Sequence, residues 1–294
     1  MNAKPFVKWA GGKSRLLPEI RRKYPFGIER EITRYCEPFV GGGAVLFDVL
    51  NRYSLDEIYI SDINRELINA YRIIRDNSDG LIEILKKLET EYYDAHEEAK
   101  KEIFYSNRRR FNDLKTTGTD NTEIASLFIF LNKTCFNGLF RVNARGLFNV
   151  PQGSYKKPCI CDEENLRAVS EKLQGVIIEC ADYRQSGGFV DKNTFVYFDP
   201  PYRPLTETSN FTAYSSGGFN DDEQAALARF IDETSERGAY ILASNSDPKN
   251  INENDDFFDK LYAKHEIFRV ESVRAINSIG TGRGRIRELL IVNG

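Results

Sequence analysis

The chain has 294 residues, of which 41% are hydrophobic and 29% are charged, with a formal net charge of −3. This composition is typical of a soluble globular protein, and the length suits one domain with an insertion. No stretch approaches the roughly 18 consecutive apolar residues of a membrane span, and the first residues lack the apolar core of a signal peptide, which predicts a cytoplasmic protein without a membrane partner.

The first predicted elements have the order strand, glycine turn, helix, strand, helix. Residues 34–37 precede Gly41-Gly42-Gly43 and then an apolar run, which predicts a strand, a turn and a helix. Residues 57–62 predict a second strand that ends in Asp62, and apolar residues at helical spacing follow from Asn64. This order of elements is typical of the beginning of a doubly wound α/β sheet.

The middle of the chain changes character. Residues 77–115 are heavily charged, with apolar side chains on one helical face, and an apolar helix is predicted near 124–131. Turn signals at Asn137-Gly138 and Arg145-Gly146 separate alternating residues between 136 and 151, which predicts a β-hairpin or an ordered loop.

An insertion therefore interrupts the sheet. Strand-like pieces resume at 176–180, 195–198, 239–243 and 289–292. We expect a catalytic domain of residues 1–75 and 165–294, and a mainly helical insertion of residues 76–164 that bears the hairpin.

The five cysteines and two histidines exclude several kinds of site. No Cys-x-x-Cys spacing is present, which argues against a disulfide framework and a zinc site. His96 and His265 are far apart, which argues against a histidine metal centre and a serine–histidine nucleophile system. We therefore expect no metal.

Basic and acidic residues are unevenly distributed. Residues 124–161 contain no acidic residue, and basic residues there alternate with aromatic rings and asparagines. A second interval without acids, residues 272–287, contains four arginines. Because local rather than total charge governs binding to a polyanion, this pattern favours a nucleic-acid surface over an ordinary solvated face.

A carboxylate, two prolines and an aromatic ring end the apolar strand 195–198. The exocyclic amino group of a nucleobase is a poor nucleophile because its lone pair is delocalised into the ring, and two acceptors that pull on its hydrogens make it reactive. Asp199 supplies one acceptor and the Pro200 carbonyl the other, on a backbone that the prolines stiffen. Tyr202 is expected to stack on the flipped base. The alternative is an ordinary turn after a strand.

Residues near the predicted turns suit a nucleotide-like cofactor. Glycines at 41–43 let a ligand approach the backbone, and Asp62 can accept both ribose hydroxyls. Trp9 and Lys13 suit a ligand with an aromatic ring and a carboxylate, and S-adenosylmethionine (SAM) has both, although Trp9 also fits a core anchor and Lys13 a solvated lysine. Asp182 can accept from the adenine amino group of the cofactor, and a helix N-cap explains it equally well.

Three motifs in this order resemble the Dam-like DNA adenine N6-methyltransferases over nearly the whole chain. They are Lys8-Trp9-Ala10-Gly11-Gly12-Lys13, Glu37-Pro38-Phe39-Val40-Gly41-Gly42-Gly43 and Asp199-Pro200-Pro201-Tyr202. Residues 136–143 and 148–151 look like the GATC-reading hairpin of that family, and Ser244-Asn245-Ser246 also resembles it. The resemblance implies a Rossmann-like SAM-dependent methyltransferase sheet with an inserted target-recognition domain, and methyl transfer from SAM to adenine N6 in duplex DNA after base flipping.

The resemblance also implies roles for single residues. The expected catalytic residues are Asp199, Pro200 and Tyr202. The expected cofactor contacts are Trp9, Lys13, Phe39, Gly41, Asp62, Asp182 and Asp199. Lys8 would contact the outer guanine, Phe136 would wedge into the stack where the adenine leaves, and Leu139, Arg141 and Pro151 would read the remaining pairs, with Asn137 and Asn143 of the same motif as further DNA contacts. Independently, an arginine can donate two hydrogen bonds to guanine.

Other functions are less favoured by the residues. An N4-cytosine methyltransferase meets the same chemical problem, but within the wider family that the chain resembles, Asp rather than Ser at position 199 favours adenine. A protein-glutamine methyltransferase goes with Asn-Pro-Pro-Tyr and does not need the basic interval. A catalytically idle DNA-binding protein that senses SAM would not need the complete motif.

The biological setting stays open in the sequence. We expect a monomer whose partner is double-stranded DNA. A functional partnership with a restriction endonuclease and a solitary regulatory role both fit the chain, and processivity and preference for hemimethylated sites are undecided.

Overall fold

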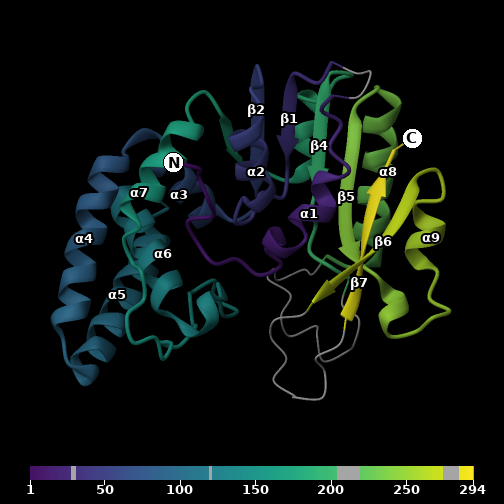
Figure 1. Ribbon diagram of the computed structural model, residues 1–294. Coiled ribbons are helices and arrows are strands. Elements are labelled where there is room, and N and C mark those ends of the chain that lie inside the picture. Colours follow the sequence, from purple (N-terminus) through teal and green to yellow (C-terminus); the bar gives the residue numbers. More distant parts are fainter. Residues whose placement is uncertain (28–30, 119–120, 204–218, 274–284, 294) are drawn as a thin grey trace. The chain divides into compact units, whose positions relative to one another are not determined.

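The computed structural model describes residues 1–27, 31–118, 121–203, 219–273 and 285–293 (Figure 1). The chain divides into two compact units. The first contains Met1–Gly12, Gly41–Tyr53 and Asp62–Cys180, and the second contains Lys13–Val40, Ser54–Ser61 and Ala181–Gly294. The expected insertion, residues 76–164, falls within the first unit, which also includes residues on either side of it. The insertion boundaries stay a prediction.

A seven-stranded mixed sheet gives the chain its α/β fold. Its strands are β1 (Arg34–Glu37), β2 (Glu57–Asp62), β3 (Ile177–Cys180), β4 (Thr194–Phe198), β5 (Tyr240–Ser246), β6 (Glu266–Val273) and β7 (Arg285–Val292), in the order β3-β2-β1-β4-β5-β7-β6. β1 is parallel to β2 and β4, and β4 to β5, whereas β7 is antiparallel to β5 and β6. The strand order reverses between β1 and β4, and ligands of such sheets bind beyond the carboxyl ends of the strands at this point.

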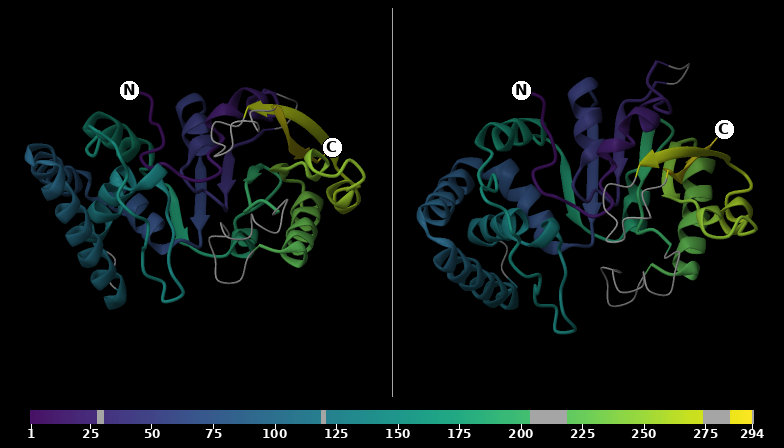
Figure 2. Two further views of the ribbon diagram at one scale, coloured as in Figure 1. Left: turned by 90° about the horizontal axis from the view of Figure 1, so that it is seen from below. Right: turned by 60° about the horizontal axis from the view of Figure 1, so that its bottom comes forward.

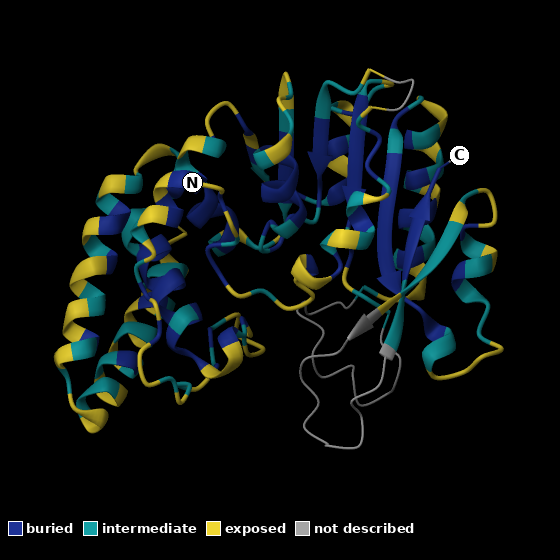
Figure 3. Cartoon of the chain, viewed as in Figure 1, coloured by how far each residue is buried: buried dark blue, intermediate teal, exposed yellow. Residues whose placement is uncertain are grey.

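Six of these strands are predicted by the sequence, and the structure confirms them. β4 is buried along its whole length, and β5 along all but its first residue (Figure 3). Strands that are covered on both faces have continuous apolar runs, which makes them easy to recognise. β6 is not predicted, because Glu266, Arg269 and Glu271 interrupt its apolar positions and its pairing with β7 makes it a strand.

The first unit is mainly helical. Its helices are α2 (Ala44–Arg52), α3 (Arg65–Asp76), α4 (Ser78–Asp94), α5 (Glu97–Thr117), α6 (Thr122–Thr134) and α7 (Glu163–Lys172), with the short 3-10 helix η2 (Phe136–Gly138). α6 is buried around most of its circumference and contacts α4 and α5, beside which it lies (Figures 1 and 2). The predicted stretch 77–115 is two helices, because His96 ends the pattern and its Nδ1 accepts the Ala99 N–H at 3.0 Å as the N-cap of α5.

Residues 136–151 form an ordered loop. Isolated bridges pair Cys135 with Gln152 and Val142 with Phe148 in antiparallel fashion, but no strand is present in this stretch. Asn112 of α5 holds the loop, since its side chain accepts the Phe148 N–H at 2.8 Å and donates to the Phe148 carbonyl at 3.1 Å. The ordered-loop prediction therefore fits the structure, and the two-stranded hairpin is not confirmed.

The other helices among the described residues belong to the second unit. They are η1 (Lys13–Arg15), α1 (Leu17–Arg21), η3 (Tyr183–Gly188), α8 (Asp221–Glu236), η5 (Pro248–Asn250) and α9 (Phe257–Leu261). α8 packs on β5, and Asn220 caps it by accepting the Glu223 N–H at 3.0 Å. Within the described ranges, no helix combines the length and the apolar character needed to cross a membrane.

Candidate functional site

Asp199 follows the last residue of β4, where the strand order reverses. Phe198 pairs with Ala243 of β5, so the next residue along each strand places Ser244 beside Asp199. The Asp199 side chain is 19% exposed. The structure thus places the predicted acceptor at the edge where ligands of parallel sheets bind.

Two donors hold one oxygen of Asp199. Lys13 Nζ lies 2.6 Å from Oδ1, and Ser244 Oγ donates to the same oxygen at 2.9 Å. The Lys13 side chain is 5% exposed, so this is a largely desolvated ion pair. The other oxygen, Oδ2, makes no hydrogen bond to a described residue, which leaves it available to a ligand.

Opposing effects act on the pKa of Asp199. Burial raises the pKa of this carboxyl above its usual value, and the negative charge of Glu288 adds to the rise, whereas Lys13 and Ser244 lower it. The same lysine lies over the Tyr202 ring, with Nζ 4.5 Å from the centroid. The sequence predicts a cofactor contact for Lys13, and in the structure its ammonium lies between the two predicted catalytic side chains.

The two proline carbonyls differ in their hydrogen bonding. Gln224 of α8 donates to the Pro201 carbonyl at 3.1 Å, and Asn245 of β5 donates to Gln224 Oε1 at 3.0 Å. Both amide side chains are almost fully buried. No described residue donates to the Pro200 carbonyl. The carbonyl of the buried Pro200, which the sequence predicts as an acceptor, therefore has no donor among the described residues, whereas that of Pro201 is fixed by the fold.

The Tyr202 side chain is fixed at its hydroxyl. This hydroxyl donates to Glu288 Oε2 at 2.7 Å. Burial, and then the negative charges of Asp199 and Glu288, raise the pKa of Tyr202 well above its usual value. The phenol is therefore neutral at ordinary pH, and its ring is held beside Lys13 as a stacking surface would need to be.

Asp62 closes the glycine turn after β1. Its Oδ2 accepts the Gly41 N–H at 3.1 Å, and its Oδ1 accepts the Asn64 N–H at 2.8 Å. Burial raises the pKa of Asp62, and hydrogen bonds from backbone N–H groups oppose this rise. Each carboxylate oxygen can accept two hydrogen bonds, so Asp62 retains capacity for the hydroxyl groups of a ligand.

Trp9 packs directly on this turn. Gly41 has a φ of 49°, and a Cβ at this position would lie 2.8 Å from Trp9 Cδ1. The indole also stacks on Phe140, with ring centroids 5.9 Å apart and an interplanar angle of 24°. Trp9 is half-buried. It therefore packs as a core anchor does while part of its ring stays exposed.

Phe39 and Asp182 belong to the second unit. The Phe39 ring stacks on Tyr183, with centroids 5.3 Å apart. Asp182 caps η3 by accepting the Arg184 N–H at 3.0 Å, and it also pairs with the Arg184 guanidinium at 3.1 Å. The N-cap explanation for Asp182 is therefore correct, and its contact with a cofactor stays a prediction.

Phe136 is the exposed aromatic residue of the 136–151 loop. Its side chain is 51% exposed, and its N–H donates to the Pro151 carbonyl at 2.9 Å. Asn137 has a φ of 55° and Gly138 a φ of 64°, and the Leu139 N–H closes this turn on the Phe136 carbonyl at 3.2 Å. An apolar ring on a tight surface turn is what insertion between base pairs requires.

A single buried amide joins Lys8 to this turn. Asn132 Oδ1 accepts the Lys8 N–H at 2.8 Å, and its Nδ2 donates to the carbonyls of Lys8 at 2.8 Å and Gly138 at 2.9 Å. The Lys8 stem covers Gly138, and its Nζ lies 4.0 Å from the centroid of the Tyr155 ring. The structure therefore brings together two predicted DNA-contacting segments that are far apart in the sequence.

Arg141 is exposed and oriented by its neighbour. Its Nε donates to Asn149 Oδ1 at 2.8 Å, and its Nη1 makes no hydrogen bond to a described residue. Asn143 shapes the same loop, because its Oδ1 accepts the Arg145 N–H at 2.9 Å and the Leu147 N–H at 3.1 Å. Arg141 thus keeps donors for a base, whereas the side-chain oxygen of Asn143 is already in use.

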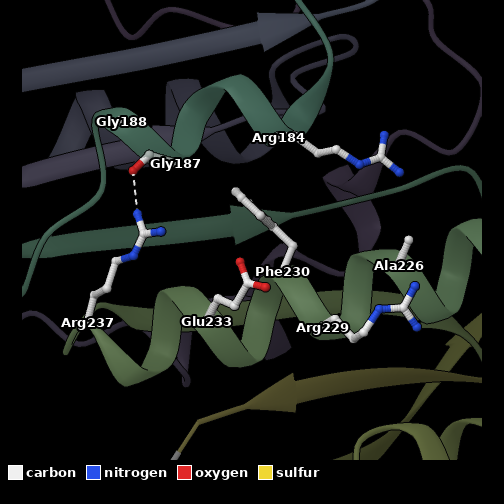
Figure 4. Close-up of a pocket in the computed structure, with 8 residues that line it drawn as sticks. All are labelled: Arg184, Gly187, Gly188, Ala226, Arg229, Phe230, Glu233 and Arg237. Atoms are coloured by element: carbon white, nitrogen blue, oxygen red, sulfur yellow. Dashed lines mark hydrogen bonds between the residues drawn. The ribbon is translucent and has the colours of Figure 1, made fainter.

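A separate hollow of about 650 Å³ lies between η3 and α8 (Figure 4). It is lined by Arg184, Gly187, Gly188, Ala226, Arg229, Phe230, Glu233 and Arg237. Arg237 donates to the Gly187 carbonyl at 2.7 Å, and Arg184 is paired with Asp182 and Glu223. The hollow contains none of the predicted site residues. Elsewhere in the described ranges, no three His, Cys, Asp or Glu side chains gather as metal ligands do.

Three residues that hold the predicted site side chains are missed by local sequence patterns. Ser244, Gln224 and Asn132 reach the predicted residues only through tertiary contacts, and no local pattern marks them beyond the resemblance of Ser244-Asn245-Ser246 to a family motif. In the second interval without acids, Arg274 and Arg283 lie outside the described residues.

Comparison with known proteins gives one family match and several related chains. Residues 9–276 match the family model described as D12 class N6 adenine-specific DNA methyltransferase. The chain is similar to the Type II methyltransferase M.MjaIII of Methanocaldococcus jannaschii, with 47% identity over 100% of both chains. It is also similar to the DNA adenine methylases of Vibrio cholerae and Escherichia coli K12. Each is 36% identical over 97% of this chain, covering 94% and 93% of those proteins, respectively.

Proposed function

Because the chain belongs to the D12 class N6 adenine-specific DNA methyltransferase family, and is thus a DNA adenine methyltransferase, we propose that it methylates adenine N6 within GATC in duplex DNA. The adenine flips out of the duplex and enters a pocket of Asp199, Pro200 and Tyr202. The observation that carries this proposal is the pair of available acceptors, Asp199 Oδ2 and the Pro200 carbonyl, in the segment that also holds the Tyr202 ring.

These acceptors act on the two hydrogens of the adenine amino group. One N–H donates to Asp199 Oδ2 and the other to the Pro200 carbonyl, which directs the nitrogen lone pair out of the ring system. Both acceptors are fixed beforehand, so they stabilise the positive charge that develops on N6, and one such group typically contributes about 3–4 kcal/mol. Asp199 acts as an acceptor and does not remove a proton before the attack. N6 loses one proton to solvent after the transfer.

Seven residues are the proposed cofactor contacts. SAM supplies the methyl group, and the bond from N6 to carbon forms while the carbon–sulfur bond breaks and its electron pair stays on sulfur. We propose that Trp9, Lys13, Phe39, Gly41, Asp62, Asp182 and Asp199 bind it. The remaining capacity of Asp62 suits ribose hydroxyls, and the exposed part of the Trp9 ring suits a flat apolar group. For Lys13, a cofactor contact competes with its ion pair to Asp199.

The DNA-reading surface is proposed on the 136–151 loop and Lys8. Phe136 fills the space that the flipped adenine leaves, because it is the exposed apolar ring on the tight turn. Lys8 and Arg141 contact guanines, and Leu139 and Pro151 contact thymine methyl groups. The absence of acidic residues from 124 to 161 supports a polyanion as the partner.

The direct test is methyl transfer from labelled SAM to two duplexes that differ only at one site. One duplex carries GATC and the other GTAC, which has the same base composition and is also palindromic. We expect label in N6-methyldeoxyadenosine from the GATC duplex alone. Equal labelling of the two duplexes would refute the proposed specificity, and label in N4-methylcytosine would refute the choice of base.

Replacing Arg141 by alanine is expected to relax specificity at one base pair of the site. A bidentate contact between arginine and guanine is worth about 1–3 kcal/mol of discrimination, so the preference for guanine at that position should fall by roughly 5- to 150-fold. The measurement is kcat/KM on duplexes with single substitutions in GATC. Arg145→Ala is the matched control, because it removes the same charge from the same exposed loop and should weaken binding to all sequences equally. Unchanged discrimination by Arg141→Ala would remove it from the readout.

Methyl transfer is expected to fall at acidic pH as Asp199 becomes protonated. The ionised carboxylate is the active form, and burial raises its pKa, so kcat should decline at a pH above the usual aspartate value of about 4. Glu288→Gln removes a negative charge that raises this pKa, and the acid limb of the profile should therefore move to lower pH. A limb that moves upward, or not at all, in Glu288→Gln would contradict the assignment of the limb to Asp199.

Oligomeric state and location are part of the proposal. We propose a monomeric enzyme that acts on cellular DNA in the cytoplasm, since its substrate is duplex DNA. Gel filtration with light scattering in the presence of a GATC duplex measures the number of protein chains per site. One chain per site is expected, and two would contradict the proposed monomer. Whether a restriction endonuclease of the same specificity accompanies the enzyme is answered by the genes that surround its own.

A further inference from the structure

Three polar groups form a hydrogen-bonded chain that ends on Asp199. Tyr197 of β4 and Ser244 of β5 have their hydroxyl oxygens 3.0 Å apart, and Ser244 Oγ lies 2.9 Å from Asp199 Oδ1. Tyr197 and Ser244 are fully buried. Their hydroxyls are therefore shielded from bulk water and find their hydrogen-bond partners within this chain of groups.

The chemistry of the groups fixes the direction of this chain. An ionised carboxylate only accepts hydrogen bonds, so Ser244 must donate to Asp199. The Ser244 oxygen then accepts from Tyr197, whose pKa burial and the nearby Asp199 charge raise well above its usual value. The phenol keeps its proton and donates it. The chain therefore runs from Tyr197 through Ser244 to Asp199.

Ser244 and Lys13 hold Asp199 in different ways. Ser244 lies on β5, a central strand that pairs with β4 on one side and with β7 on the other, so its position is set by the sheet. Lys13 reaches Oδ1 with a long side chain whose ammonium also contacts the Tyr202 ring. Long side chains lose much rotamer freedom in a fixed contact, whereas serine on a paired strand loses little. Ser244 is thus the donor that persists if the lysine is drawn elsewhere.

We propose that Ser244, supported by Tyr197, is a positioning residue that fixes the rotation of the Asp199 carboxylate so that Oδ2 faces the adenine amino group. This inference rests on the proposed methyl transfer and names the residue that orients its principal acceptor. With Oδ1 held by a rigid donor, the plane of the carboxylate is set before the base arrives. Without Ser244, the carboxylate turns more freely, and productive alignment of Oδ2 becomes rarer.

The charged and titratable groups around Asp199 make the role measurable. Lys13 of η1 and Ser244 of β5 lower the pKa of Asp199, and Glu288 of β7 raises it, while Tyr197 and Tyr202 stay neutral beside it. Loss of the Ser244 hydroxyl removes one group that favours the ionised form. The acid limb of the kcat profile must then move to higher pH, which a purely structural role of Ser244 would not produce.

The experiment compares Ser244→Ala, Tyr197→Phe and the double variant with the wild type on a GATC duplex. We expect Ser244→Ala to lower kcat about 10-fold or more, because hydrogen bonds to charged groups are the stronger ones, with KM for SAM and DNA within about twofold and the acid limb at higher pH. Tyr197→Phe should lower kcat about threefold. Because Tyr197 acts through Ser244, the double variant should match Ser244→Ala.

Ser126→Ala is the matched control. It also removes a fully buried hydroxyl, which donates to the Thr122 carbonyl of its own helix, and it should keep the wild-type kcat and acid limb. The proposal would be overturned if the losses of kcat in the two single variants multiplied in the double variant. It would also be overturned if Ser244→Ala kept kcat within twofold of the wild type and left the acid limb of the pH profile unmoved. If a thermal melt shows that Ser244→Ala is unfolded, the test rests on Tyr197→Phe. An unchanged kcat in Tyr197→Phe would then overturn the proposal. No transfer by the wild type refutes the proposed function and this inference together.

Discussion

Asp199→Asn is expected to lower kcat for adenine methylation by about 10²- to 10³-fold, the loss that follows removal of one preorganised electrostatic group. Affinity for the GATC duplex and thermal stability should stay close to those of the wild type. The measurement is single-turnover methyl transfer with enzyme in excess, together with DNA binding by fluorescence anisotropy.

The size of this effect follows from how Asp199 is held. Lys13 and Ser244 both donate to Oδ1, so the amide oxygen of asparagine takes that position. The amide NH₂ group then falls where Oδ2 was, and it presents donors to the donors of the adenine amino group. Because the Lys13 ammonium keeps an acceptor, the variant avoids the large destabilisation that an unpaired buried charge produces.

The control for Asp199→Asn lies at the other end of the same strand. Asp191 precedes β4, pairs with Arg34 at 2.7 Å, and has a side chain 48% exposed. Asp191→Asn removes the same charge near the amino end of β4 and should keep the wild-type kcat. Activity of Asp199→Asn within about threefold of the wild type would exclude Asp199 as the acceptor.

Gly41→Ala is expected to weaken SAM binding by about 10-fold or more. An alanine Cβ would lie 2.8 Å from Trp9 Cδ1 and 3.1 Å from Nε1, so the indole must move. The left-handed φ of 49° adds backbone strain of about 1–2 kcal/mol. Trp9 is the only tryptophan of the chain, so its fluorescence reports both its displacement and its response to SAM.

Gly175→Ala separates the collision from the strain. Gly175 also has a positive φ, 76°, but nothing lies within 4 Å of a Cβ built there. This variant should lose a similar amount of stability and keep the wild-type affinity for SAM and the wild-type emission. If Gly41→Ala binds SAM as the wild type does, the packing of Trp9 on the glycine turn is not part of the cofactor site.

The sequence predicts the central strands well because they are buried. The runs that become β4 and β5 have to be apolar on both faces, and this requirement is visible without a structure. β6 depends on its pairing with β7, and the break between α4 and α5 depends on the His96 cap, so neither has a strong local pattern. In the 136–151 loop the turn signals are correct, and of the two predicted alternatives the ordered loop fits, because the arms make isolated bridges and not strands.

The candidate site also contains residues that the sequence reveals and residues that it does not. Asp199, Pro200 and Tyr202 are consecutive enough for a motif to reveal them, and their chemistry explains the motif. The side chains that hold them come from η1, α8, β5 and β7. The contact between Lys13 and Asp199 alone spans 186 positions (199 minus 13). Contacts over such separations depend on the sheet register, which single-sequence patterns do not specify.

The Asn132 amide has a consequence for engineering new target sequences. Its three hydrogen bonds tie the backbone of Lys8 to the turn that carries Phe136. A chimera that receives only a foreign 136–151 segment keeps a host lysine fitted to a different turn. Grafts should therefore transplant the amino-terminal segment and the end of α6 together with the loop, since Asn132 holds these three segments of the proposed DNA-reading surface together.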